Sequence, residues 1–356
     1  MRAALVGLPQ SGKSTLFAAL AEAGGSHVHL DRPDQQHLAV VKVPDERLDW
    51  LEEHYKPKKK THAEIEFLDV PGLDLSSDAG RRHARTHWPA IRQSDMIVIV
   101  LRDFRDDTVP PYRNRIDPAA DLEELRAEML FSDLEQATGR VEKLWASVGK
   151  PTPEQDRNIH ELELMQRFVE ALESEKPLTE VISDKAEEKM ARAFAFQTLK
   201  PVLVVLNSDE DAAVDAEADR FGGYAAIRLS AKIEEEIASL APADRGEFME
   251  AMGISTLAHD RLVRSCYKAM NLITFLTAGE KECRAWSIPA GADALTAAGQ
   301  IHSDIARGFI RAQVIAFDDL KAAGSEKAAR AAGKFRLEGK NYIVRDGDEI
   351  LFRFNV

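Results

Sequence analysis

The residues best suited to chemistry stand near the start of the chain, in a stretch with the spacing G-x-x-x-x-G-K-[ST]. It runs Gly7-Leu8-Pro9-Gln10-Ser11-Gly12-Lys13-Ser14. In such a loop, backbone N–H groups and the free amides of the following helix point at one spot, where the helix dipole adds positive potential. The stretch predicts a phosphate-binding loop in which Lys13 reaches the β- and γ-phosphates and Ser14 ligates Mg²⁺. The residues expected to bind nucleotide here are Gly7, Pro9, Gln10, Ser11, Gly12, Lys13, Ser14 and Thr15.

A second motif, Asp69-Val70-Pro71-Gly72, follows the alternating segment 63–68. A carboxylate at the end of a strand beside a phosphate loop can hold the hydration shell of Mg²⁺, so Asp69 is the second expected metal residue. Gly72 can bring its backbone N–H close to the γ-phosphate because no side chain intervenes. The next residue, Leu73, stands where Ras-like GTPases have a glutamine that orients the attacking water. Leucine cannot orient water, so hydrolysis must use another group or be slow.

Two further segments match the loops that hold the base. Asn207-Ser208-Asp209-Glu210 stands where GTPases carry N-K-x-D, with Ser208 in place of the lysine and Glu210 in place of the aspartate. The segment Ser230-Ala231-Lys232 matches the S-A-K loop. We expect Asn207, Glu210, Ser230, Ala231 and Lys232 to contact the nucleotide. The two replacements predict no strong preference for guanine.

No metal site other than Mg²⁺ is indicated by the histidines. His27 and His29, and also His83 and His87, lack a set of cysteine or histidine partners at metal-ligand spacing. We interpret them as surface residues.

The elements that must position these motifs can be read from hydrophobic patterning. Residues 96–101 and 201–206 are continuous apolar runs, which is typical of parallel strands buried on both faces. Shorter strands are expected at 3–6, 38–43, 63–68 and 227–229, with a helix directly after the phosphate loop. Four motifs in the GTPase order, each after a strand, predict an α/β Ras-like doubly wound sheet. The polar stretch 27–36 is then expected to be the first switch loop.

The interval between the strands at 96 and 201 is too long for a simple crossover. Asp117-Pro118 has the pattern of a helix N-cap followed by proline at the first helical position. An apolar heptad rhythm follows, is interrupted by Gly149-Lys150-Pro151-Thr152-Pro153, and gives way to a second helical pattern. This predicts an antiparallel helical hairpin, an inserted coiled-coil arm. The residues with apolar helical spacing are Leu130, Leu134, Ala137, Val141, Leu144 and Val148, then Ile159, Leu162, Met165, Val169 and Leu172.

From about Leu272 the pattern changes to short strands joined by turns, with one helix expected near 296–309. Strands are expected at 272–277, 282–288, 312–317, 334–337, 342–344 and 350–354, which predicts a small β-grasp domain. The expected domains are therefore a P-loop nucleotide-binding domain of residues 1–116 and 200–271, a helical insertion of residues 117–199, and a C-terminal domain of residues 272–356.

Composition sets outer limits on function. The 356 residues carry a net charge of -13, which argues against a protein that coats nucleic acid electrostatically but allows a local basic patch. No apolar run is long enough to cross a bilayer. Met1-Arg2 leads directly into a core strand, so no signal peptide is expected. Cys266 and Cys283 are interpreted as reduced thiols of a cytoplasmic protein.

With these motifs in place, the sequence resembles the YchF family of Obg-like ATPases nearly from end to end. The resemblance is tightest in the C-terminal segments, which are similar to the family's TGS domain. These segments are 277–282 with 284–286, 308–312, 336–340 and 352–356. Further segments similar to the family are 43–48, 56–59, 207–210 and 230–234.

The resemblance implies a discontinuous nucleotide-binding domain, a coiled-coil arm, a TGS domain, ATP favoured over GTP, and association with ribosomes. It also implies a hydrophobic residue in place of the catalytic glutamine, as at Leu73. Two segments depart from the family pattern. The position of a switch threonine falls near Pro33, where only Asp31 or Asp34 offers an oxygen, and the second switch, 76–83, has one glycine. The chain is therefore expected to be a divergent paralogue.

Two functions follow from these observations. The first is a Mg²⁺-dependent, slow ATPase, also able to use GTP, that acts as a ribosome-associated switch, with RNA contacts through the TGS domain and the arm. The second is a nucleotide-holding module that binds ribosomes or RNA with little hydrolysis; the altered switches favour it more than they would in an ordinary family member. A small-molecule kinase would need neither the Asn207 loop nor the Ser230-Ala231-Lys232 loop.

Overall fold

The computed structural model describes residues 1–25, 35–148, 153–210, 220–241 and 243–355. The chain forms two compact units, one made of Met1–Ala39 and Glu66–His259 and the other of Val40–Ile65 and Asp260–Val356. The switch positions Asp31, Pro33 and Asp34 and the pair His27 and His29 lie outside the described residues. Within the described part of the chain, no helix is long and apolar enough to cross a membrane.

A seven-stranded sheet, ordered β2-β4-β1-β5-β6-β8-β7, forms the centre of the first unit. The pairs β4-β1, β1-β5, β5-β6 and β6-β8 are parallel, and β7 runs antiparallel to its neighbour β8. β5 is buried along nearly its whole length, as its apolar run predicted. The bounds are β1 Arg2–Val6, β2 His37–Lys42, β4 Glu64–Asp69, β5 Met96–Asp103, β6 Val202–Ser208, β7 Arg220–Phe221 and β8 Tyr224–Leu229.

Helices cover this sheet. α1 (Lys13–Ala23) starts inside the predicted phosphate loop and packs beside α9 (Ala231–Ser239), which starts inside the S-A-K loop. α3 (Asp78–Arg85) and α4 (Trp88–Arg92) follow the D-x-x-G motif. α10 (Arg245–Ala251) comes after α9. The two helices that begin at the predicted loops are thus adjacent, which brings their N-termini to one region of the sheet.

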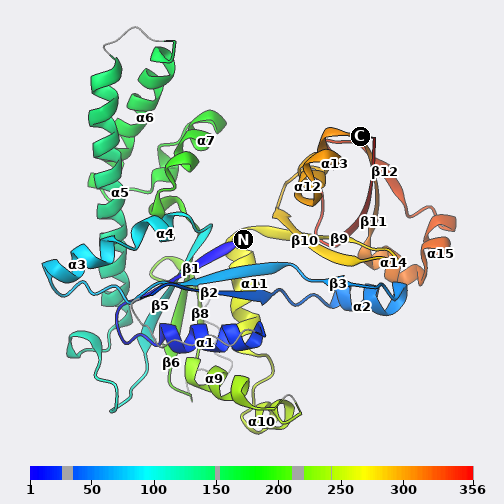
Figure 1. Ribbon diagram of the computed structural model, residues 1–356, viewed down its shortest axis with the longest axis horizontal. Coiled ribbons are helices and arrows are strands. Elements are labelled where there is room, and N and C mark those ends of the chain that lie inside the picture. The colour runs from blue at the N-terminus through cyan, green and yellow to red at the C-terminus, as the bar shows by residue number, and fades with distance from the viewer. Residues whose placement is uncertain (26–34, 149–152, 211–219, 242, 356) are drawn as a thin grey trace. The chain divides into compact units, whose positions relative to one another are not determined.

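The predicted arm is an antiparallel pair of helices, α5 (Pro118–Val148) and α6 (Gln155–Glu173), which lie side by side in Figure 1. Asp117 accepts a hydrogen bond of 3.0 Å from the backbone N–H of Ala120, as expected of an N-cap. Most of the predicted seam lies in the hairpin core, in which Ala137 and Leu144 are buried against residues of α6. Ile159 is an exception, since its side chain is 39% exposed. Further elements in this region are η1 Tyr112–Asn114, η2 Leu178–Glu180, α7 Lys185–Phe194 and η3 Gln197–Leu199. The breaker residues 149–152 lie outside the described residues.

The second unit contains a six-stranded sheet, ordered β12-β11-β13-β9-β10-β3. The predicted hairpin of β9 (Leu272–Thr277) and β10 (Cys283–Pro289) is confirmed as an antiparallel pair. Two expectations are wrong. The helix expected at 296–309 is two helices, α12 (Ala294–Ile301) and α13 (Ser303–Arg307), because His302 is extended and caps the second. The strand expected at 342–344 is reduced to an isolated bridge between Ile343 and Asp293.

The remaining elements of this unit are the other strands of that sheet and the helices of the unit. A core forms where one sheet face packs on α12 and includes Phe275, Ala298, Val314 and Phe352. The other bounds are α2 Glu46–Tyr55, β3 Lys60–Thr61, α11 Ala258–Ala269, β11 Phe309–Ala316, α14 Phe317–Ala323, α15 Glu326–Ala331, β12 Arg336–Glu338 and β13 Asp348–Phe354.

Candidate nucleotide-binding site

The predicted chemical residues gather at one pocket of about 1280 Å³ in the first unit. It lies where the parallel strands β1, β6 and β8 end, since the loops that follow these strands line it. The carboxyl edge of a parallel sheet is where α/β folds bind ligands. Of the predicted residues, the pocket is lined by Pro9, Gln10, Ser11, Gly12, Lys13, Ser14, Thr15, Gly72, Asn207, Glu210, Ser230, Ala231 and Lys232.

The phosphate loop has a shape that only glycine permits at two points. Gly12 adopts the left-handed conformation, with φ of 81°, and a Cβ there would lie 2.0 Å from the Nδ2 atom of Asn207. Gly7 does not line the pocket; it lies beneath the loop, where a Cβ would be 2.7 Å from the carbonyl oxygen of Val100. The buried Oγ of Ser11 has no hydrogen-bond partner within the described residues. A tight loop that requires glycine, together with the Ser11 hydroxyl available to donate a hydrogen bond, suits a phosphate group.

Lys13 and Asp69 form a buried ion pair. Lys13 lies in the first turn of α1 and Asp69 ends β4, so the fold places the predicted phosphate cation beside the predicted metal carboxylate. Asp69 itself does not line the pocket, whereas Ser14 lines it and is exposed. Within the described residues no group of three His, Cys, Asp or Glu side chains could hold a metal on its own. A metal here would therefore need oxygens from the bound nucleotide, as Mg²⁺ commonly does.

The D-x-x-G segment is attached directly to the phosphate loop. The backbone N–H of Leu73 donates to the carbonyl oxygen of Gly7 over 3.0 Å, and a Cβ at Gly72 would lie 3.2 Å from Cα of Pro9. The Leu73 side chain is completely buried in the core and does not line the pocket. It can neither position water nor exchange a proton there.

Asn207 joins the phosphate loop to the S-A-K loop. Its Nδ2 donates to the carbonyl oxygen of Ser11 over 3.0 Å, and its Oδ1 accepts from the backbone N–H of Ala231 over 2.9 Å. Ser230 caps α9 by accepting from the N–H of Ile233. The asparagine is buried, so both of its hydrogen bonds are shielded from water.

The two replaced residues of the base loop have other partners. Ser208 Oγ donates to Asp103 over 2.9 Å and receives a hydrogen bond of 2.6 Å from Arg228. Glu210 forms an ion pair of 2.8 Å with Lys232, and this hydrogen bond raises the pKa of the lysine. The carboxylate that stands where GTPases recognise guanine is thus already paired.

One wall of the pocket was missed by sequence reasoning. It comes from the loop after β5 and from the ends of the base-loop segments, at Phe104, Arg105, Asp106, Thr108, Val109, Asp209 and Glu235. Buried Arg102 supports it by donating to the carbonyl oxygens of Phe104, Val109 and Gln10, and burial lowers the pKa of Arg102. The only available sequence signal was position, because this loop follows the buried apolar run at 96–101.

One histidine expectation is wrong. His87 is buried rather than on the surface, because it precedes α4 and stacks edge-on against His83. Burial, aided by the positive charges of His83 and Lys13, lowers the pKa of His87. His83 is exposed, as expected.

Comparisons with known proteins agree with this architecture. The family model MMR_HSR1, described as "50S ribosome-binding GTPase", matches residues 2–131, and YchF-GTPase_C, described as "Protein of unknown function (DUF933)", matches residues 272–355. Proteins named "Ribosome-binding ATPase YchF" are similar over the full length. The Bacillus subtilis protein is 38% identical, covering 100% of each chain, and the Pasteurella multocida protein is 37% identical, covering 99% of this chain and 98% of the relative.

The chain belongs to the YchF family. Its fold is also that of a solved family member, the YchF GTPase of Schizosaccharomyces pombe, with a TM-score of 0.82 and 28% identity over 99% of this chain and 97% of the other. The predicted α/β fold, a P-loop domain with a C-terminal YchF domain, is confirmed.

Proposed function

We propose that this YchF protein binds ATP with Mg²⁺ in the pocket, hydrolyses it slowly, and associates with ribosomes. The observation that carries the nucleotide half is structural: one pocket collects the phosphate loop, Gly72, the Asn207 loop and the Ser230-Ala231-Lys232 loop. The proposed association with ribosomes is supported by the relatives, which are named ribosome-binding ATPases and match over the whole chain.

In this proposal, the phosphate-loop backbone and Lys13 bind the phosphates, Ser14 holds the metal, and Asp69 supports its hydration shell. Gly72 presents its N–H to the γ-phosphate, while the Asn207 and Ser230 loops hold the base. The metal supplies charge neutralisation of the phosphates. Lys13 would exchange its partner Asp69 for a phosphate when nucleotide binds, which leaves Asp69 available to the metal shell.

A nucleotide-holding protein with little hydrolysis is the second candidate. It is favoured by the complete burial of Leu73, because the D-x-x-G segment then brings no side chain that could orient water. Both candidates place the protein in the cytoplasm, where ribosomes are, and both keep the proposed domains: 1–116 with 200–271, 117–199, and 272–356.

Single-turnover hydrolysis distinguishes the two candidates. ATP and GTP would each be mixed with excess protein, with and without ribosomes, and phosphate release followed over time. A slow ATPase switch predicts measurable turnover that ribosomes change. Phosphate release that never exceeds the protein-free rate, with nucleotide still bound, would leave only the holding function.

The ribosomal contact is proposed to include the exposed part of one face of the C-terminal sheet. Gln313 on β11 lies opposite Leu337 on β12 and Leu351 on β13, and Arg311 lies opposite Arg353. Their neighbour in the strand, Ala312, faces the core, so these five side chains share the other face. Leu351 is 54% exposed there, whereas Gln313 is buried and accepts a hydrogen bond of 3.1 Å from Arg353. Two arginines directly opposite each other repel, and an RNA phosphate between them would remove that cost.

Replacing Arg311 and Arg353 together with glutamine tests this surface. Co-sedimentation with ribosomes should weaken, and its salt dependence should become shallower, because fewer phosphate counterions are released. Arg307→Gln is the matched control, since Arg307 is also exposed but pairs with Asp304 on α13. If the unmodified chain, the double variant and Arg307→Gln show the same salt dependence, the ribosomal contact does not involve this face.

A further inference from the structure

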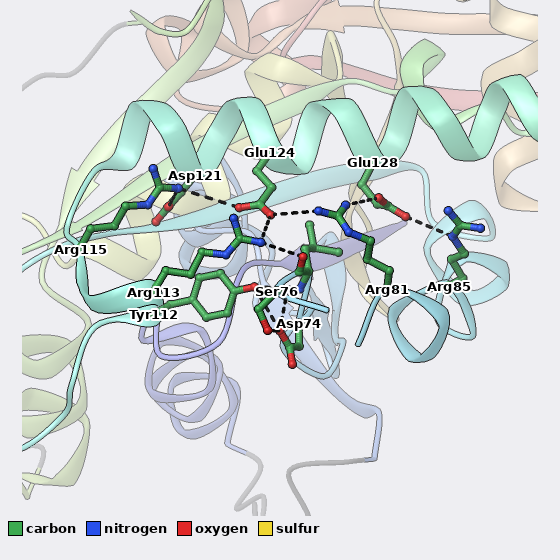
Figure 2. A network of polar contacts seen from close by, with 11 residues as sticks. Asp74, Ser76, Arg81, Arg85, Tyr112, Arg113, Arg115, Asp121, Glu124 and Glu128 are labelled. Carbon is green, nitrogen blue, oxygen red and sulfur yellow. Dashed lines mark hydrogen bonds and ion pairs between the residues drawn. The ribbon is translucent and has the colours of Figure 1, made fainter. Parts of the chain in front are cut away.

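The segment that follows Gly72 is bound to the base of the arm by a continuous set of polar contacts. Figure 2 shows this network, in which side chains of residues 74–85 meet side chains from the loop at 112–115 and from the first turns of α5. All of these residues belong to the first unit. The network lies outside the pocket and has no role in the chemistry proposed above.

The network begins next to the nucleotide site. Leu73, whose N–H is bonded to Gly7 of the phosphate loop, has its side chain in the same core cluster as Leu75. That cluster also contains Leu122, Leu125 and Met129, all from α5. The residues directly after Gly72 therefore pack on the arm helix. Close-packed interiors transmit a displacement rather than absorbing it.

Tyr112 and Asp74 fix the next residues. The Tyr112 hydroxyl donates to Asp74 Oδ1 over 3.1 Å and accepts from the N–H of Leu75 over 2.9 Å. Ser76 adds hydrogen bonds to the same carboxylate oxygen from its N–H and its hydroxyl, at 2.9 and 2.6 Å. These bonds lower the pKa of Asp74, so it stays ionised. The backbone of Gly80 approaches Asp74 so closely that a Cβ at Gly80 would lie 2.6 Å from the carbonyl oxygen of Asp74. Only glycine fits at this position of the turn.

Arginines make the connection to α5. Arg113 donates to the carbonyl oxygen of Leu75 over 2.8 Å and forms an ion pair of 2.7 Å with Glu124. Arg81 and Arg85, both on α3, form ion pairs of 3.0 and 3.2 Å with Glu128. The side chains of Glu124 and Glu128 are only 13% and 5% exposed.

Two features make these contacts hard to break. A buried carboxylate that loses its cation remains desolvated and unpaired, which is far more costly than losing an exposed pair. Arg113 and Asn114 also hold left-handed backbone conformations, with φ of 54° and 56°. Non-glycine residues adopt that conformation at a cost and keep it when the surroundings enforce it. Movement of the segment after Gly72 should therefore carry α5 with it.

We propose that this network couples the nucleotide to the arm: Glu124 and Glu128 convert a change at Gly72 into a change in the orientation of α5, and so in the affinity for ribosomes. The inference rests on the proposed function and adds its regulation. Beyond Glu128, α5 continues for 20 residues to Val148, which at 1.5 Å rise per residue makes a lever of about 30 Å, so a small rotation at its base is amplified along the arm. Since coupling between two sites is reciprocal, ribosome binding alters nucleotide affinity by the same factor.

The test compares ribosome affinity in two nucleotide states. Full-length protein is loaded with Mg²⁺ and either AMP-PNP, which is not hydrolysed, or ADP, and its affinity for purified ribosomes is measured. For the unmodified chain we expect the two affinities to differ by at least about fivefold. In the double variant Glu124→Gln, Glu128→Gln, the ratio should fall towards one. Nucleotide affinity without ribosomes should change by less than about threefold, since neither residue lines the pocket.

Controls separate coupling from stability. Glu123→Gln removes an exposed carboxylate of the same helix whose ion pair is with Arg126, outside the network, and should keep the ratio of the unmodified chain. If the double variant folds poorly, Arg113→Gln removes a cation that is 36% exposed and should lower the ratio less. Hydrogen exchange at residues 118–135 gives a second readout: the difference between the two nucleotide states should disappear in the double variant, shrink in Arg113→Gln and persist in Glu123→Gln.

The outcomes separate this inference from the function beneath it. If the unmodified chain binds no nucleotide or no ribosomes, the proposed function fails. If it binds both but the two nucleotide states give equal ribosome affinity, or if the variants keep the full ratio, the coupling is wrong while the function stands. Exchange at 118–135 that rises equally in both states, with the ratio intact, would make the network purely structural.

Discussion

Asn207 illustrates how much of the site depends on single side chains. One amide group holds the phosphate loop through Ser11 and the S-A-K loop through Ala231, and it occupies the space that a Cβ at Gly12 would need. The sequence identified all four residues, because each belongs to a motif. It could not show that Ser208 turns towards Asp103 and Arg228, or that Glu210 pairs with Lys232, since these contacts join segments distant in the chain.

At the residue scale, we predict that ATP binds at least as well as GTP. An aspartate at the position of Glu210 would select guanine through its N1–H and N2–H₂ donors, whereas Glu210 is longer and is already paired with Lys232. Loss of a well-made polar contact should flatten the discrimination. Competition binding measures the ratio, and restoring the motif with Ser208→Lys and Glu210→Asp should shift it towards GTP. A preference of the unmodified chain for GTP by about a hundredfold or more would contradict the prediction.

A second prediction at this scale concerns hydrolysis. Leu73→Ala should reduce the turnover per folded molecule less than Asp69→Ala does, because Leu73 is buried away from the pocket while Asp69 supports the metal. The leucine variant should instead lose about 2–5 kcal/mol of stability, as is usual for a truncated core side chain. Turnover must therefore be normalised to the folded fraction, measured by circular dichroism. A larger turnover loss in Leu73→Ala would require an indirect role for its packing.

At the scale of elements, the hydrophobic periodicity and the capping and turn residues predicted most of the fold. The apolar runs gave β5 and β6, the heptad rhythm gave the arm, and Asp117 was correctly identified as a cap. The helix at 296–309 was wrong because no proline or glycine marks the break; His302 is extended and caps α13 with its ring nitrogen. The pocket wall at Phe104 and Thr108 was missed because its residues follow no motif.

The C-terminal sheet yields a prediction about pH. Glu349 on β13 is buried, and burial together with the negative charge of Glu326 raises its pKa to about 7, while Arg330 opposes the shift. A carboxyl with a raised pKa favours folding below its ordinary value of 4.5, and this contribution is lost as the pH rises through about 7. The difference between the two pKa values, 4.5 and about 7, lowers the free energy of unfolding above pH 7 by about 3 kcal/mol.

Glu349→Gln removes the charge but keeps the shape. Its free energy of unfolding at pH 8 should exceed that of the unmodified chain by about 1–3 kcal/mol, and the gain should vanish below about pH 4.5. Urea denaturation at the two pH values measures this. A gain that is the same at both would mean that Glu349 does not titrate between them.

At the scale of the whole molecule, the chain combines a nucleotide pocket, an arm and a C-terminal sheet domain. The family comparison supports all three, because relatives match over the full length and the solved YchF structure covers 99% of this chain. The sequence predicted the three parts but not the network of Arg81, Arg113, Glu124 and Glu128. Charged residues on a helix are usually solvated, and only the folded structure shows that these acids are buried between α3 and α5.

The central claim is that the pocket binds nucleoside triphosphate, and calorimetric titration of Lys13→Ala with Mg²⁺ and ATP tests it most directly. Hydrogen bonds to charged groups contribute about 1.5–3 kcal/mol, so the variant should bind ATP at least about tenfold more weakly than the unmodified chain. Lys232→Ala removes an exposed lysine of the S-A-K loop that lines the same pocket and is paired with Glu210, so it controls for the loss of a positive charge at the pocket. Thermal melting checks the fold. The account predicts a severe loss for Lys13→Ala and a small one for Lys232→Ala. Unchanged affinity in a folded Lys13→Ala variant would contradict it.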